Sequence, residues 1–134
     1  QLSDNVVKME DLYNKFKVLQ NFDINRLMGY EGSMATIYWD SLKLILDIEF
    51  IGRITQGAKD IVNSSLNYGY AILYGKIQNS LVKAGVSLNI SFLHSLDKQK
   101  PTLVFDMIEE FRSFVVDRIV ISMINKDEPI KLDK

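Results

Sequence analysis

The chain has 134 residues, a formal net charge of −1, 25% charged residues and 47% hydrophobic residues, which are values typical of one folded domain. It contains no cysteine, which excludes disulfides, thiolate metal ligands and cysteine nucleophiles. Apolar runs such as "IVISMI" are too short to span a bilayer and "QLSDNVVK" has no signal-peptide core, so we expect a cytoplasmic protein without a membrane segment.

The N-terminal part of the sequence predicts helices. Residues 5–20 place apolar side chains at helical spacing. Asp23 is a candidate N-cap for the segment "INRLMGY", and a second helical stripe of apolar residues follows from Glu31. Gly52 and Gly57 then mark a loop, because glycine interrupts regular structure.

The C-terminal part predicts two longer helices. Asp60 suits the N-terminus of the first, and Gly85 is a suitable C-terminal stop. Glycine inside a helix costs about 1 kcal/mol relative to alanine, so small residues at such positions usually permit close helix packing. The small residues inside this predicted helix are Gly69, Ala71 and Gly75. The last helix is expected from Pro101, well suited to a first helical position, to about Asn125. No strand pattern is strong enough to build a sheet, so the predicted fold class is an all-α helical bundle.

The last predicted helix carries an acidic cluster. Asp106 precedes Glu109 by three residues and Glu110 by four, which places these side chains on one side of a helix. An apolar stripe is expected on another side: Phe105, Ile108, Phe111, Val115 and Ile119. Spacing alone favours a solvent-facing acidic surface, since like charges repel at this distance and the helix N-terminus mildly favours negative charge.

Two further residues offer a second interpretation. His94 is the single histidine and lies upstream of the acidic cluster, although a lone histidine is more often a surface or core residue than a metal ligand. Glu31 is framed by Gly29 and Gly32, whose small size leaves space around the carboxylate and allows close approach of another helix. A metal site made of Glu31, His94 and Glu109 is possible on these grounds, but it is the less favoured interpretation.

Four segments favour the metal site over the solvent-facing acidic surface. They are "YEGSMATIYW", "GRITQGAKDIVNSSLNYGYAILYGKIQNSLVKAG", "FLHS" and "PTLVFDMIEEFRSFVVDRIVISMIN". In this order, from about Leu27 to Asn125, they resemble the C-terminal catalytic domain of the CRISPR-associated spacer-acquisition integrase, the numeral-one Cas protein. The resemblance implies that residues 1–134 form a single helical, metal-binding catalytic domain. The family's N-terminal β-rich domain is lacking, and the chain starts with Gln1 rather than methionine, so we expect a fragment.

The resemblance also implies a catalytic site. The metal-binding glutamate of the family falls on Glu31, its histidine on His94, its third acidic ligand on Glu109, and an auxiliary catalytic acid on Asp106. Two carboxylates and one neutral imidazole suit Mn²⁺ or Mg²⁺. The implied activity is that of a metal-dependent DNA endonuclease and integrase, which inserts new spacers into the CRISPR array by phosphodiester transesterification.

Candidate DNA contacts and partners follow from the same resemblance. Basic residues expected around the pocket are Arg53, Lys59, Lys98, Lys100 and Arg112, although each alone is more often a solvated surface charge. Tyr68, Tyr70 and Tyr74 could stack on bases, but their helical spacing favours packing against neighbouring helices. The implied partners are protospacer and repeat DNA, a second copy bound through the absent N-terminal domain, and the small partner subunit, the numeral-two Cas protein.

Two other functions stay open. The net charge of −1 and the absent domain favour a non-catalytic helical module that binds DNA or a partner and is inactive as an isolated fragment, because nucleic-acid binders usually carry a basic excess. A transposon-encoded integrase of the same superfamily is the other alternative. Such relatives usually have extra C-terminal DNA-binding segments, and none is visible in this sequence.

Overall fold

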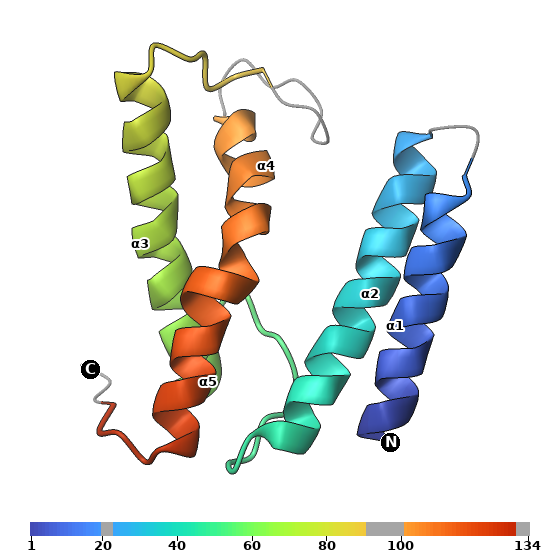
Figure 1. The fold of residues 1–134 in the computed structure, drawn as a ribbon. Helices are drawn as coiled ribbons and strands as arrows, with labels where there is room; N and C mark the ends of the chain where they lie inside the picture. Colours follow the sequence, from blue (N-terminus) through green and yellow to red (C-terminus); the bar gives the residue numbers. More distant parts are fainter. Residues whose placement is uncertain (20–22, 91–100, 131–134) are drawn as a thin grey trace. The chain divides into compact units, whose positions relative to one another are not determined.

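The computed structural model describes residues 1–19, 23–90 and 101–130. This part of the chain is helical and contains no strand, which confirms the predicted all-α class (Figure 1). None of its helices is both long enough and apolar enough to cross a membrane. The chain divides into two compact units, Gln1–Arg53 and Ile54–Lys134, which are described one at a time. Compact units of this kind also occur within one domain, so the single domain over residues 1–134 stays a prediction.

The first unit is a pair of antiparallel helices, α1 (Leu2–Lys17) and α2 (Ile24–Ile45), which lie side by side in Figure 1. The side chain of Asp23 accepts a hydrogen bond of 3.0 Å from the backbone N–H of Asn25, so the predicted N-cap is confirmed. The two segments expected after Asp23 and from Glu31 form one continuous helix.

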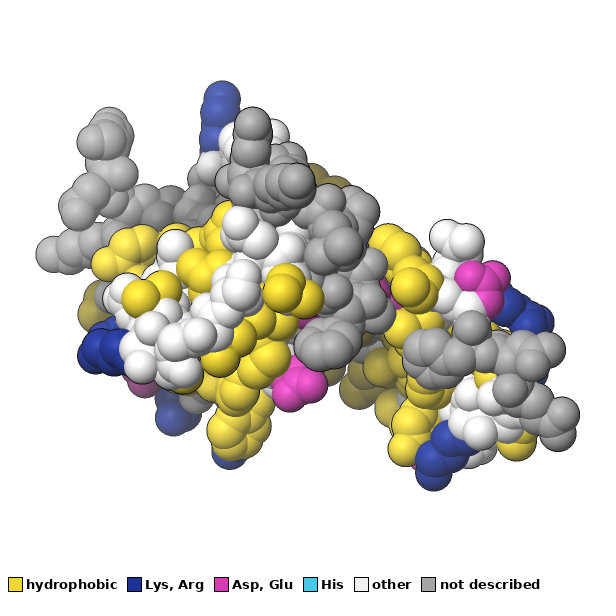
Figure 2. Space-filling view, turned by 90° about the horizontal axis from the view of Figure 1, so that it is seen from above, with side chains coloured by type: hydrophobic (Ala, Val, Ile, Leu, Met, Phe, Trp, Pro, Cys, Tyr) yellow, Lys and Arg dark blue, Asp and Glu magenta, His cyan; other side chains and the backbone are white. Residues whose placement is uncertain are grey.

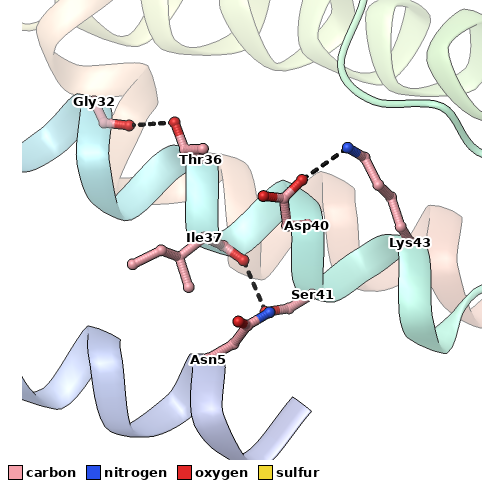
Figure 3. Close-up of polar contacts among 7 residues, drawn as sticks. All are labelled: Asn5, Gly32, Thr36, Ile37, Asp40, Ser41 and Lys43. Atoms are coloured by element: carbon pink, nitrogen blue, oxygen red, sulfur yellow. Dashed lines mark hydrogen bonds and ion pairs between the residues drawn. The ribbon is translucent and has the colours of Figure 1, made fainter. Parts of the chain in front are cut away.

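Polar and aromatic contacts join α1 to α2 at both ends of the pair. The Asn5 amide donates to the Ser41 hydroxyl at 3.1 Å, and that hydroxyl donates to the Ile37 carbonyl at 2.7 Å (Figure 3). Near the other end, the rings of Phe16 and Tyr30 pack edge to face with centroids 6.0 Å apart. These contacts fix the register of the two helices.

In the second unit, α3 (Ile61–Lys83) lies antiparallel to a continuous helical run (Figure 1). The run consists of α4 (Thr102–Phe111), η1 (Arg112–Asp117) and α5 (Arg118–Asn125). The segment η1 is a π-helix, in which backbone hydrogen bonds span five residues instead of four. The run ends at the predicted residue, and it begins one residue later than predicted because Pro101 occupies the N-cap position.

The core of the second unit forms where α3 meets this run. Its buried apolar side chains are Val62, Leu66, Tyr70, Leu103, Val104, Ile108, Val116, Val120 and Ile124. Gly69 of α3 lies directly against Val116, since a Cβ at position 69 would stand 2.5 Å from Val116 Cγ1. The prediction of close packing at the glycines of this helix is therefore confirmed at Gly69, but it is wrong at Gly75, where no neighbour lies within 4 Å of an added Cβ. Gly85, with φ of +70°, follows the end of α3 as expected.

The π-helix changes which residues of the run are buried. The expected apolar stripe holds for Ile108, but it is wrong further on, because Phe111, Val115 and Ile119 are 39%, 36% and 54% exposed. The buried residues after Ile108 are Val116, Val120 and Ile124. In a regular α-helix of 3.6 residues per turn, Val116 would point away from the side of the helix on which Ile108 lies. The wider turn of η1 absorbs the extra residue and leaves apolar side chains exposed. Figure 2 shows hydrophobic side chains on the surface of the molecule in general.

Candidate functional site

The three predicted metal ligands fall in three parts of the chain. Glu31 lies on α2 in the first unit and is exposed. Glu109 lies on α4 in the second unit, and its side chain is 36% exposed. His94 lies outside the described residues. The convergence of these three side chains on one ion therefore stays a prediction.

The donor chemistry of the predicted set suits its proposed ion. Within residues 1–19, 23–90 and 101–130, no three histidine or acidic side chains are grouped so that they could hold a metal. The predicted set includes His94, so it is not complete within these ranges. Two carboxylates and an imidazole form a hard, oxygen-rich donor set that fits Mn²⁺ or Mg²⁺.

The glycines that frame Glu31 lie in open space. Within the first unit, no atom beyond the backbone of α2 itself stands within 4 Å of where a Cβ at Gly29 or Gly32 would lie, so α1 does not approach α2 closely at these glycines. Their carbonyl groups instead accept hydrogen bonds from hydroxyls one turn later, Ser33 to Gly29 at 2.8 Å and Thr36 to Gly32 at 2.9 Å. The second of these bonds is drawn in Figure 3. Within the first unit, the small residues here leave the Glu31 side of α2 uncrowded.

Glu109 belongs to a polar network that runs from α4 through η1 to α3. The Arg112 guanidinium places Nη1 2.6 Å from Glu109 Oε1. Its central carbon lies 5.0 Å from the centroid of the Tyr70 ring, at cation–π distance. The Tyr70 hydroxyl in turn donates a short hydrogen bond to Asp117 Oδ1. We call Glu109, Arg112, Tyr70 and Asp117 the Glu109 network.

The inner part of this network is buried. Asp117 is 2% exposed and Tyr70 is 9% exposed. Burial of a carboxylate is unfavourable unless it is hydrogen-bonded, and the Tyr70 hydroxyl supplies such a bond. Arg112 Nε is buried and has no hydrogen-bond acceptor among the described residues, an arrangement that costs about 1–3 kcal/mol. A buried polar network at a π-helix is typical of a functional site.

Sequence reasoning did not select Tyr70 or Asp117 as site residues. Tyr70 packs into the core as the helical spacing of the tyrosines indicated, and Tyr74 packs against Phe105 with centroids 5.4 Å apart. The same expectation is wrong for Tyr68, which is 72% exposed. The signal for Asp117 was its position as a single acid in the apolar run "FVVDRIV", because an acid is almost never fully buried without a partner.

The basic residues expected around the pocket are also distributed over the chain. Arg53 lies in the first unit, with its guanidinium carbon 5.8 Å from the Trp39 ring centroid. Lys59 is exposed in the loop before α3, and Arg112 is paired with Glu109. Lys98 and Lys100 lie outside the described residues. A shared DNA-binding pocket formed by these five residues stays a prediction.

The motif "AKD…N…LNYGYA" has a clear structural role at the start of α3. Asp60 accepts hydrogen bonds from the backbone N–H of Asn63 at 2.8 Å and from its side-chain amide at 3.0 Å. The side-chain amide oxygen (Oδ1) of Asn63 accepts a hydrogen bond from the backbone N–H of Ile54 at 2.8 Å, and Asn63 is 1% exposed. The motif therefore caps the helix and attaches the preceding loop to it.

Comparisons with known proteins agree with this all-α architecture. The chain matches the family described as CRISPR associated protein Cas1 over residues 1–133. A "CRISPR-associated endonuclease Cas1 1" of Francisella tularensis subsp. novicida is 40% identical over 118 residues, which cover 86% of this chain and 37% of that protein. A protein of the same name from Methanospirillum hungatei is 39% identical over 127 residues, which cover 93% of this chain and 38% of that protein.

A solved structure shares the fold. A CAS1 protein from Thermotoga maritima superimposes with a TM-score of 0.72 at 21% sequence identity, covering 97% of this chain and 48% of that chain. The helical arrangement is that of a Cas1-type fold. The chain belongs to the Cas1 family, which confirms the resemblance seen in the sequence. The matched stretches span 37% and 38% of the length of the two curated relatives.

Proposed function

We propose that this chain forms the catalytic part of a metal-dependent DNA endonuclease and integrase of CRISPR adaptation. The observation that carries the proposal is membership in the Cas1 family, with relatives 40% and 39% identical that are named endonucleases. The reaction is a phosphodiester transesterification. A DNA 3′-hydroxyl loses its proton and attacks a phosphodiester of the CRISPR repeat, and the 3′-oxygen of the adjoining nucleotide leaves and takes up a proton. When water replaces the 3′-hydroxyl, the same site cleaves DNA.

In this proposal, Glu31, His94 and Glu109 hold Mn²⁺ or Mg²⁺. The bound ion supplies Lewis-acid polarisation of the phosphodiester and stabilises charge on its oxygens. Asp106, three residues before Glu109 on α4, adds negative charge that favours a cation at this position. Without a cation the same carboxylates repel phosphate, so the activity depends strictly on the metal.

The proposed DNA contacts are Arg53, Lys59, Lys98, Lys100 and Arg112. Arginine and lysine bind phosphate without reading sequence, so these residues position the DNA and make its binding salt-dependent. The proposed partners are protospacer and repeat DNA, a second copy of the protein, and the small partner subunit of the adaptation complex.

Single substitutions test the metal ligands. Glu31→Gln, His94→Asn and Glu109→Gln are each expected to reduce Mn²⁺-dependent strand transfer by about 100-fold or more, because even the loss of a group that supports a ligand costs 10–100-fold. Glu110→Gln is the matched control, since it removes the same charge from the next, exposed position on α4. Wild-type strand transfer by all three ligand variants would refute the proposed site.

One observation favours a second candidate function, the non-catalytic helical module. The Glu109 carboxylate already has a cationic partner, Arg112, at 2.6 Å. Calorimetric titration with Mn²⁺ separates the two functions. Binding that is lost in His94→Asn supports the catalytic site, whereas a helical scaffold shows no binding that depends on His94.

A further inference from the structure

Two residues of η1 contact the same tyrosine on α3. Arg112 is the first residue of the π-helix and Asp117 is the last. The Arg112 guanidinium lies over the Tyr70 ring at 5.0 Å, and Asp117 accepts the hydrogen bond from the Tyr70 hydroxyl. In an α-helix, residues five apart point about 140° apart around the axis. In a π-helix, five residues complete close to one turn, so both side chains reach the same tyrosine.

Among the described residues, the Arg112 guanidinium makes two directional contacts. One is its ion pair with Glu109, where Nη1 and Oε1 are 2.6 Å apart. The other is the face of the Tyr70 ring, and a planar guanidinium stacks on an aromatic face in a defined orientation. Because Arg112 is 37% exposed and Tyr70 is 9% exposed, the tyrosine is the more firmly fixed of the two. The position of the guanidinium thus depends on the position of the ring.

The Tyr70 ring is fixed in turn by Asp117. The hydrogen bond between them is buried and links α3 to the end of η1. A buried bond between a neutral hydroxyl and an acid is strong where water is excluded. The four side chains therefore form one ordered series, from Asp117 through Tyr70 and Arg112 to the carboxylate of Glu109.

We propose that Tyr70 and Asp117 are positioning residues for Glu109, which act through Arg112 and determine how tightly the Glu109 carboxylate binds a divalent cation. This inference rests on the proposed function, because it takes Glu109 as a metal ligand. Carboxylates that bind metals are usually held by further hydrogen-bonding groups, and loss of such a group weakens metal binding by 10–100-fold. Asp117 holds Tyr70 on the core side of Arg112, and Arg112 contacts the carboxylate.

The first test is Tyr70→Phe, which removes the hydroxyl and keeps the ring. We expect about tenfold weaker Mn²⁺ binding by calorimetry, with an unchanged helical circular dichroism spectrum. Asp117→Asn is a second variant, which keeps the shape of the acceptor and removes its charge. Tyr74→Phe is the matched control, because it removes a hydroxyl one turn later on α3, where the ring packs on Phe105. Tyr74→Phe is expected to bind Mn²⁺ like the wild type.

A double variant separates positioning from general stabilisation. If Tyr70 acts through Glu109, Tyr70→Phe causes no further loss of Mn²⁺ affinity in a Glu109→Gln background. A role in stability alone would weaken Mn²⁺ binding equally in both backgrounds. The metal-free protein gives an independent readout, since the buried Arg112 Nε–H should exchange with water more slowly in the wild type than in Tyr70→Phe, as measured by NMR.

The outcomes distinguish this inference from the proposed function. If Glu109→Gln weakens Mn²⁺ binding and both Tyr70→Phe and Asp117→Asn bind like the wild type, the positioning role is wrong and the metal ligand stands. If Glu109→Gln itself binds Mn²⁺ like the wild type, the ligand assignment is wrong, and the inference is overturned with it.

Discussion

Gly69 of α3 lies so close to Val116 of η1 that a methyl group at position 69 would stand 2.5 Å from Val116 Cγ1. Val116 cannot easily withdraw, because it is 6% exposed and its β-branched side chain has few rotamers. We expect Gly69→Ala to lower the free energy of unfolding by about 1–3 kcal/mol through overpacking. Chemical denaturation of the variant measures this change.

Gly75, six residues later on α3, is the control for this prediction. Beyond the local backbone of α3 and the two adjoining residues, no atom lies within 4 Å of the place that an added methyl group would occupy, so the main change there is in helix propensity. Gly75→Ala is expected to stabilise the chain by about 0.5–1 kcal/mol. If both variants shift stability in the same direction, the close contact between Gly69 and Val116 does not exist in solution.

The cap at the start of α3 gives a second prediction. Asp60 accepts two hydrogen bonds from Asn63, one from the backbone and one from the side chain. Asp60→Ala removes both and should lower the free energy of unfolding by about 1–2 kcal/mol. Asp60→Ser retains an N-cap oxygen and should lose less. Thermal unfolding gives the order of the three proteins, and equal melting temperatures would contradict the capping role.

A third prediction concerns the register after η1. Val120 is 7% exposed and Ile119 is 54% exposed, the reverse of what the apolar stripe in the sequence indicates. Val120→Ala should therefore lower the free energy of unfolding by about 2 kcal/mol through loss of buried methyl groups. Ile119→Ala should change it by less than about 0.5 kcal/mol, as is usual for exposed positions. The opposite order in denaturant titrations would mean that the helix is regular there.

Removal of the metal is a fourth prediction, and it follows from the proposed function. Treatment with a chelator should abolish strand transfer, and added Mn²⁺ should restore it. Ca²⁺ should restore it poorly, since Ca²⁺ prefers six to eight oxygen ligands at longer distances. Recovery after Mn²⁺ addition is the control that the chelator has not unfolded the protein. Full strand transfer in excess chelator would refute a metal-dependent reaction.

Local signals in the sequence were enough to predict the helices. Asp23 and Asp60 have side-chain oxygens that satisfy the first free N–H groups of a helix, and both are N-caps in the structure. Gly85 adopts the positive φ that favours glycine after a helix end. These features depend on neighbours within a few residues, which is why they could be predicted.

The π-helix and the Glu109 network could not be predicted in this way. No local feature of "EEFRSFVVD" indicates a wider turn. The effect of the turn is on packing, since it lets the residues before and after it contact α3 together. The expected stripe therefore failed at Phe111. The helical spacing of the acidic residues around Glu109 favoured a solvent-facing surface. Only the resemblance to the Cas1 family indicated a metal site there. With His94 outside the described residues, that site stays a prediction.

The wider turn at η1 also has a consequence for comparing sequences. Val116 follows Ile108 by eight positions, and both side chains are buried in the same core. In a regular helix, the residue that faces the same side would follow after seven positions. A homologue whose helix is regular throughout should be one residue shorter here, so its alignment should carry a single gap between positions 112 and 117. An alignment without that gap would pair the buried residues of one protein with the exposed residues of the other.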